Sequence, residues 1–204
     1  MKIKNLLFSA IFLIIGFIFF YSVSGSDENY IASVQKWRQE SELSLRRVSE
    51  STIIKAEDSV KLDYYPIVPQ YRVNANLQKN STYETVQINE SNGSKTAFVK
   101  YGTLQFELLD KEYELTLYQD LKNSTHFLLP FKDSTSGVTT YGAGRMIPLK
   151  IIGDQPIVEI DFNRAFNPYC AYNPEYICPI TPPENTLSVR IQAGEKTPKS
   201  PLYN

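Results

Sequence analysis

Residues 133–145 hold one group of side chains that could do chemistry. This segment ends in Tyr-Gly-Ala-Gly-Arg, where Gly142 and Gly144 let the backbone turn sharply and present its N–H groups. Arg145 adds a planar cation that pairs well with carboxylate, phosphate or sulfate. The sequence therefore predicts an anion-binding loop. A nucleotide-binding P-loop is excluded because no Gly-Lys-Ser/Thr follows the glycines.

Three carboxylates border the irregular segments of the chain: Asp133, Asp161 and Glu184. If these segments meet at one end of a sheet, Asp161 and Glu184 could face each other as the acid/base pair of a glycoside hydrolase. Aspartates at strand ends also cap turns, and either carboxylate could instead pair with Arg145 as a structural partner. The catalytic assignment therefore stays open, with these two residues as its candidates.

Residues 162–185 combine five prolines, four asparagines, three tyrosines and both cysteines. A loop of this length is usually functional or disordered, and its aromatic residues favour an ordered loop folded over one end of the sheet. Flat rings and amides there are typical of a small-ligand cleft, for an acidic or sugar-like ligand. The expected lining comprises Tyr141, Asn163, Asn167, Tyr169 and Tyr172.

The two cysteines, Cys170 and Cys178, are separated by seven intervening residues within this loop. In an exported chain the default expectation for such a pair is a disulfide. A zinc site would need four ligands, whereas only His126 could join the two thiols. The sequence predicts a disulfide, no metal site and no cofactor.

The amino terminus predicts export. Lys2 and Lys4 precede an uncharged, mostly apolar run over residues 6–23, which is 18 residues long. This exceeds the apolar core of about 7–15 residues in a cleaved signal and suits a membrane-spanning helix. Residues 1–25 are expected to be a retained anchor, with a cleaved signal peptide as the alternative. Either places the domain in the cell envelope, outside the cytoplasm, and the anchor would make the membrane a partner.

The remaining chain is predicted to hold one amphipathic helix at 26–50 and one β-rich domain at 51–204. Apolar residues recur at helical spacing up to residue 48, and alternation with period two begins at residue 59. Asn92-Gly93 and Asp110-Lys111 are predicted turns. The expected strands are 59–65, 71–77, 95–102, 103–109, 112–118, 126–132, 157–162 and 186–193. This pattern favours a mainly antiparallel β-sandwich or partly open barrel with one N-terminal helix.

Charge excludes one class of partner. The chain carries 21 Lys and Arg against 22 Asp and Glu, so it lacks the basic excess of a nucleic-acid-binding domain.

Three stretches also resemble a known family in order and spacing: "TSGVTTYGAGR", "IDFNRAFNPYCAYNPEYICPITPPEN" and "IQAGEK". They are similar to the core of the bacterial and archaeal family called domain of unknown function 1684. The resemblance runs from about residue 64 to residue 196 and implies no mechanism. It leaves three interpretations: a ligand-binding module, an envelope hydrolase, or a scaffold whose loops only cap the sheet.

Overall fold

The computed structural model describes residues 27–46 and 62–199. The predicted anchor or signal segment, residues 1–25, lies outside these ranges. None of the described helices is both long enough and apolar enough to cross a membrane.

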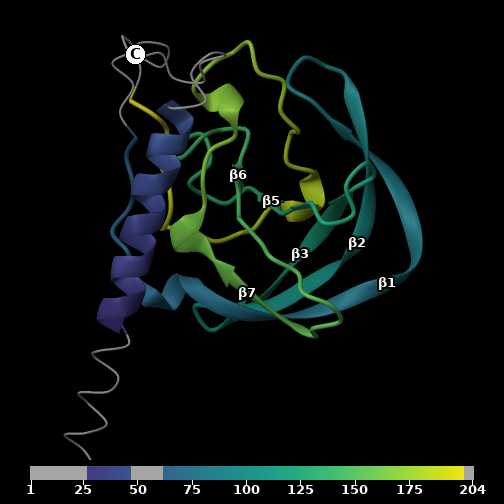
Figure 1. Cartoon of the computed structure of the whole chain (residues 1–204), viewed down its shortest axis with the longest axis horizontal. Coiled ribbons are helices and arrows are strands. Elements are labelled where there is room, and N and C mark those ends of the chain that lie inside the picture. Colours follow the sequence, from purple (N-terminus) through teal and green to yellow (C-terminus); the bar gives the residue numbers. More distant parts are fainter. Residues whose placement is uncertain (1–26, 47–61, 200–204) are drawn as a thin grey trace, which may run out of the picture.

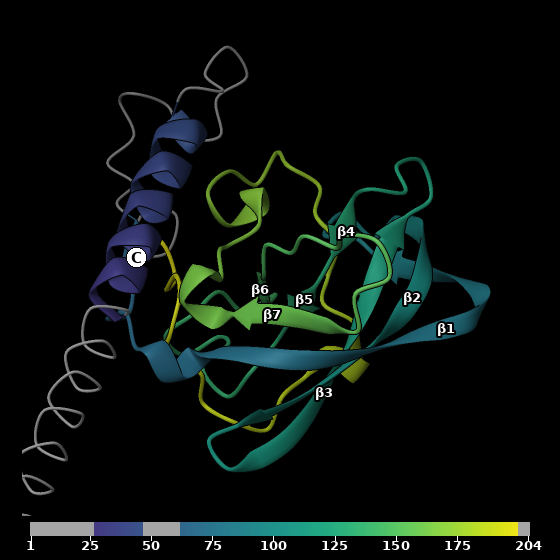
Figure 2. The same ribbon diagram turned by 60° about the horizontal axis from the view of Figure 1, so that its bottom comes forward.

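Five antiparallel strands form the main sheet, in the spatial order β4-β3-β2-β1-β7 (Figures 1 and 2). They are β1 (Arg72–Asn89), β2 (Lys95–Leu108), β3 (Lys111–Asp120), β4 (Phe127–Leu128) and β7 (Ile157–Asp161). A separate two-stranded ladder joins β5 (Pro130–Phe131) to β6 (Arg145–Met146). Four short 3-10 helices complete the described elements: η1 (Pro69–Tyr71), η2 (Phe162–Arg164), η3 (Tyr169–Ala171) and η4 (Pro183–Asn185). The prediction of a mainly antiparallel β-domain is confirmed. The sheet is not closed into a barrel, because its edge strands β4 and β7 do not pair with each other.

The two long hairpins follow from local backbone chemistry. Gly93 adopts a φ of 86° in the turn between β1 and β2, as the predicted Asn-Gly turn requires. The turn between β2 and β3 uses Leu109 and Asp110, which both have positive φ, so it begins one residue earlier than predicted. The pairing shifts register between Lys79 and Glu84 on β1, and such an irregularity bends a strand. Figures 1 and 2 show the resulting curvature of β1 and β2 around the interior.

The concave side of the sheet is filled by the second half of the chain. Residues from β2 and β3, such as Leu104 and Leu115, are fully buried against Phe131, Phe162 and Ile191. Burying such side chains contributes about 1.5–3 kcal/mol each. The second layer therefore consists mostly of irregular segments that carry the candidate functional residues.

Several predicted strands differ from the structure. Residues 95–108 form one strand rather than two, and the strand continues through Gly102, where a side chain would lie 2.5 Å from the carbonyl oxygen of Gln78. Residues 186–193 belong to no named strand, although every second residue from Leu187 to Ala193 faces inward or is half-buried. Within the described part of 59–65, only Tyr64 makes a bridge, to Glu195. The sheet is smaller than expected for this reason.

The N-terminal helix, residues 27–46, packs on the β-domain, as its apolar stripe predicts. Val34 is fully buried, and the Tyr30 hydroxyl donates to Asp161 Oδ1 at 2.9 Å. Arg38 donates to the carbonyl oxygens of Tyr65 and Asn163, both at 3.0 Å. In Figure 2 the helix stands beside η1 and the end of β7. This position makes it one wall of the site described next.

Candidate functional site

Arg145, the predicted anion-binding residue, is fully buried in β6. Its guanidinium donates to the carbonyl oxygens of Ile191, Ala193 and Glu195, and lies 3.4 Å from Asp133 Oδ1. Burial lowers the pKa of the guanidinium, and the charge of Asp133 opposes that shift. The carboxylate partner is therefore Asp133 rather than Asp161 or Glu184, and Arg145 serves to join β6 to the C-terminal segment.

The glycines before Arg145 do not form an anion-binding cradle around its side chain. Gly144 is buried with a φ of 103°, and a side chain there would lie 2.2 Å from Thr181 Oγ1 and 2.7 Å from the Phe131 carbonyl oxygen. Gly142 is exposed. The close packing explains why glycine is needed at position 144.

The predicted carboxylate pair is not brought together around one cavity. Asp161 accepts from the backbone N–H of Asn163 at 3.0 Å and forms an ion pair with Arg164 at 3.1 Å. Glu184 accepts from the Tyr118 hydroxyl at 2.8 Å, on a different part of the surface. Asp161 lines a cavity beside Trp37, whereas Glu184 lines cavities that border β3 and residues 180–183. Asp161 and Glu184 therefore do not flank one cavity as the acid/base pair that the sequence suggested.

Asn163 is also structural. Its side chain is fully buried, accepts from the backbone N–H of Val68 at 3.0 Å, and donates to the Val68 carbonyl oxygen at 2.9 Å. It donates to the Tyr30 hydroxyl as well, at 2.8 Å. These bonds hold η1, η2 and the N-terminal helix together behind the site.

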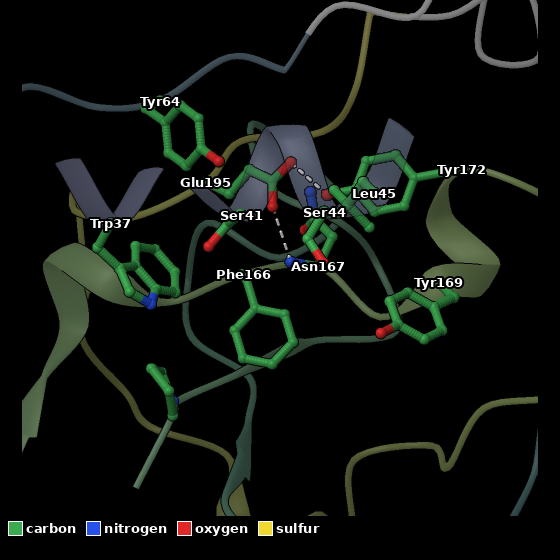
Figure 3. A pocket seen from close by; sticks show the side chains of 11 residues that line it. Trp37, Ser41, Ser44, Leu45, Tyr64, Phe166, Asn167, Tyr169, Tyr172 and Glu195 are labelled. Carbon is green, nitrogen blue, oxygen red and sulfur yellow. Dashed lines mark hydrogen bonds between the residues drawn. The ribbon is translucent and has the colours of Figure 1, made fainter. Parts of the chain in front are cut away.

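The predicted aromatic loop does border a cavity, of about 270 Å³, between itself and the N-terminal helix. Three predicted residues line it: Asn167, Tyr169 and Tyr172. Figure 3 shows aromatic rings arranged around the carboxyl group of Glu195. The other lining residues are Trp37, Ser41, Ser44, Leu45, Tyr64, Pro148 and Phe166. Tyr141, the remaining predicted wall residue, instead packs against Tyr172 and Ala171, outside the cavity lining.

Glu195 is the chemically distinctive group of this cavity. Its residue is 1% exposed, and its carboxylate accepts from the Tyr172 hydroxyl and from the backbone N–H of Asn167. Burial raises the pKa of Glu195 to about 7, although these hydrogen bonds and the charge of Arg145 act in the opposite direction. Burial raises the pKa of Tyr172 well above its ordinary value, and the charge and hydrogen bond of Glu195 raise it further. A carboxyl group that titrates near neutral pH is a common feature of functional sites.

Asn167 contributes a second polar group. Its residue is 1% exposed, and its side-chain N–H donates to the Lys196 carbonyl oxygen at 2.8 Å. Its Oδ1 is buried, and no described residue donates to it. A buried acceptor without a partner costs about 1–3 kcal/mol.

The sequence offered only a weak sign of Glu195. It lies in "IQAGEK", one of the three stretches that resemble the family, but no spacing rule relates it to the aromatic loop. Gly194 before it has a φ of 73°, and a side chain there would lie within 2.8 Å of two carbonyl oxygens. The position of Glu195 therefore depends on a glycine that packs tightly against Phe162 and Ala165.

The two cysteines lie next to each other in the aromatic loop. The backbone N–H of Cys170 donates to the sulfur of Cys178 at 3.1 Å, and both thiols are free and buried. A hydrogen bond from the Cys178 thiol lowers the pKa of Cys170 to about 7 and raises that of Cys178. The disulfide stays a prediction, and the closeness of the two residues is compatible with it.

A family model and a solved structure are similar to this chain. The family described as "Protein of unknown function (DUF1684)" matches residues 58–196, which confirms the resemblance seen in the sequence. No curated protein matches the chain. The solution NMR structure of an uncharacterised protein from Haloarcula marismortui is similar, with 29% identity and a TM-score of 0.60. That likeness covers 81% of this chain and 97% of the archaeal chain. The chain belongs to the DUF1684 family.

Proposed function

We propose that the cavity around Glu195 binds a small, neutral, sugar-like molecule. The observation that carries this proposal is the buried pair of acceptors, Glu195 and Asn167 Oδ1, enclosed by aromatic rings. Sugar rings combine apolar C–H faces with hydroxyl donors. Aromatic side chains suit the faces, and buried acceptors suit the hydroxyls.

Charge favours a neutral ligand over an acidic one. The cavity lining holds no Lys or Arg, and its one ionisable carboxyl group would repel an anion. A cationic ligand is less favoured too, because Arg38 and Arg145 already lie close enough to interact with the charge of Glu195. The acidic ligand expected from the sequence depended on Arg145, whose side chain is buried elsewhere.

Binding is favoured over hydrolysis. A glycoside hydrolase of the usual kind needs two carboxyl groups about 5–9.5 Å apart, flanking the bond that is broken. Glu195 is the sole Asp or Glu among the residues that line this cavity. Binding is also favoured over a pure scaffold, because Glu195 and Asn167 line a cavity together with aromatic rings.

Ligand binding is testable through Trp37, the single tryptophan of the chain, which lines the cavity. We expect a saturable change in Trp37 fluorescence when full-length protein is titrated with members of a panel of neutral monosaccharides. Tyr169→Ala should weaken that binding about two- to ten-fold, because a stacked ring contributes about 0.5–1.5 kcal/mol. Calorimetry on the same samples provides an independent affinity.

Tyr83→Ala is the matched control, since Tyr83 is 79% exposed on β1 and does not line the cavity. It should bind as the wild type does. No saturable change with any sugar, or an equal loss in both tyrosine variants, would contradict the proposal.

We propose further that this binding takes place in the cell envelope, with the protein anchored by residues 1–25. The support is the 18-residue apolar run behind Lys2 and Lys4. A periplasmic reporter enzyme fused after residue 30 should be active. If instead only a reporter that works in the cytoplasm were active at the same fusion site, residue 30 would lie in the cytoplasm and this assignment would be refuted.

A further inference from the structure

A second cavity adjoins the one that holds Glu195. It has a volume of about 530 Å³, and Trp37 and Pro148 line both cavities. The two spaces therefore lie on either side of one shared boundary, formed by the N-terminal helix and the segment after β6.

The second cavity differs in chemistry from the first. Its lining mixes charged and amide side chains of both donor and acceptor type: Asn74, Lys150, Gln155, Glu159, Asp161 and Arg164. Asp161 and Arg164 pair with each other at 3.1 Å, and Glu159 pairs with Arg72 at 3.6 Å. The charges are thus largely balanced within the protein, which suits a neutral ligand that is rich in hydroxyl groups.

Size supports a shared ligand. Sites for small molecules usually have volumes of about 300–1,000 Å³. The first cavity alone, at about 270 Å³, falls below this range, and both cavities together fall well inside it.

We propose that the two cavities are adjacent subsites of one groove and that the ligand is a short oligosaccharide. One sugar unit occupies the aromatic cavity at Glu195, and the next lies beyond Trp37 among the polar side chains. Trp37 and Pro148, which line both cavities, contact both units. This inference rests on the proposed sugar-binding function and adds to it the length of the ligand and the polarity of its second unit.

The experiment compares ligands of increasing length on the full-length protein. Calorimetry would use glucose with its β-1,4-linked oligomers and N-acetylglucosamine with its β-1,4-linked oligomers, each from one to four units. We expect affinity in one series to rise at least ten-fold between one unit and two or three units, then to level off. The double variant Asn74→Ala/Gln155→Ala should remove most of that gain, since both side chains line only the second cavity.

A matched control lies in another cavity, beside β3 and η4. Gln105→Ala/Ser188→Ala removes an amide and a hydroxyl there and should keep the full gain with length. If a monosaccharide binds and longer oligomers bind no more tightly, the second subsite is refuted and the proposed function stands. If neither monomers nor oligomers of any series bind, the proposed function itself is refuted.

Discussion

Replacing Arg145 by methionine should lower the free energy of unfolding by about 3–5 kcal/mol. Arg145 is buried, and its removal leaves the Asp133 carboxylate without its cation in a region that water does not reach. Three backbone carbonyl oxygens of the C-terminal segment lose a donor at the same time. Urea denaturation of wild type and variant, followed by circular dichroism, measures the difference.

Arg190→Met is the control for this effect. Arg190 is exposed and makes one long hydrogen bond, 3.4 Å, to the Ser134 carbonyl oxygen, so its replacement should change stability by about 0.5 kcal/mol at most. A loss below about 1 kcal/mol for Arg145→Met would show that the guanidinium does not hold the C-terminal segment. It would also reopen the possibility that Arg145 binds an anion.

Titration of Glu195 should make the protein less stable as the pH rises toward and past neutrality. Its pKa is raised in the folded protein from an ordinary 4.5 to about 7. Between these two values the unfolded chain releases the proton and the folded protein keeps it, so a higher pH favours unfolding. The full contribution is present below about pH 4.5 and is lost once the pH exceeds 7. The total loss is about 3 kcal/mol, from about 1.4 kcal/mol per pH unit.

The variant Glu195→Gln isolates this contribution. Glutamine can accept from the Asn167 backbone N–H without ionising, so the decline in unfolding free energy between pH 5 and pH 8 should be smaller by most of that 3 kcal/mol. Glu107→Gln, at an exposed position on β2, should keep the wild-type decline. Equal declines in the wild type and in Glu195→Gln would show that Glu195 does not titrate in this range.

Local patterns predicted the elements whose structure depends on local chemistry. The apolar stripe around Val34 and Trp37 formed a docked helix, and Asn92-Gly93 formed the first hairpin turn. The strand predicted at residues 186–193 was wrong. Alternation of apolar and polar residues indicates which side chains are buried, but it does not indicate which groups the backbone hydrogen-bonds to. There the backbone bonds to irregular partners, such as the N–H of Ile191 to Asp133 Oδ2 at 2.7 Å.

The sequence predicted part of the candidate site, again where a local pattern was sufficient. Tyr169, Tyr172 and Asn167 were found because an aromatic loop without strands must fold over something. Arg145 and Asp161 have residue types that suit a site, yet the fold uses both as internal ties. Glu195 was missed because its burial depends on the tertiary packing of Tyr64, Tyr172 and the helix, which no short sequence pattern encodes.

The family match begins at residue 58, whereas four of the residues that line the aromatic cavity, Trp37 to Leu45, lie before it. The cavity is therefore formed by two parts of the chain. Glu195 comes from the range that matches the family, and the lining residues Trp37 to Leu45 come from the N-terminal helix outside that range. The family match alone therefore does not specify the whole cavity, because the helix residues that line it lie outside the matched range. A comparison of this cavity with the same region of a relative requires the relative's own N-terminal segment as well as its matched domain.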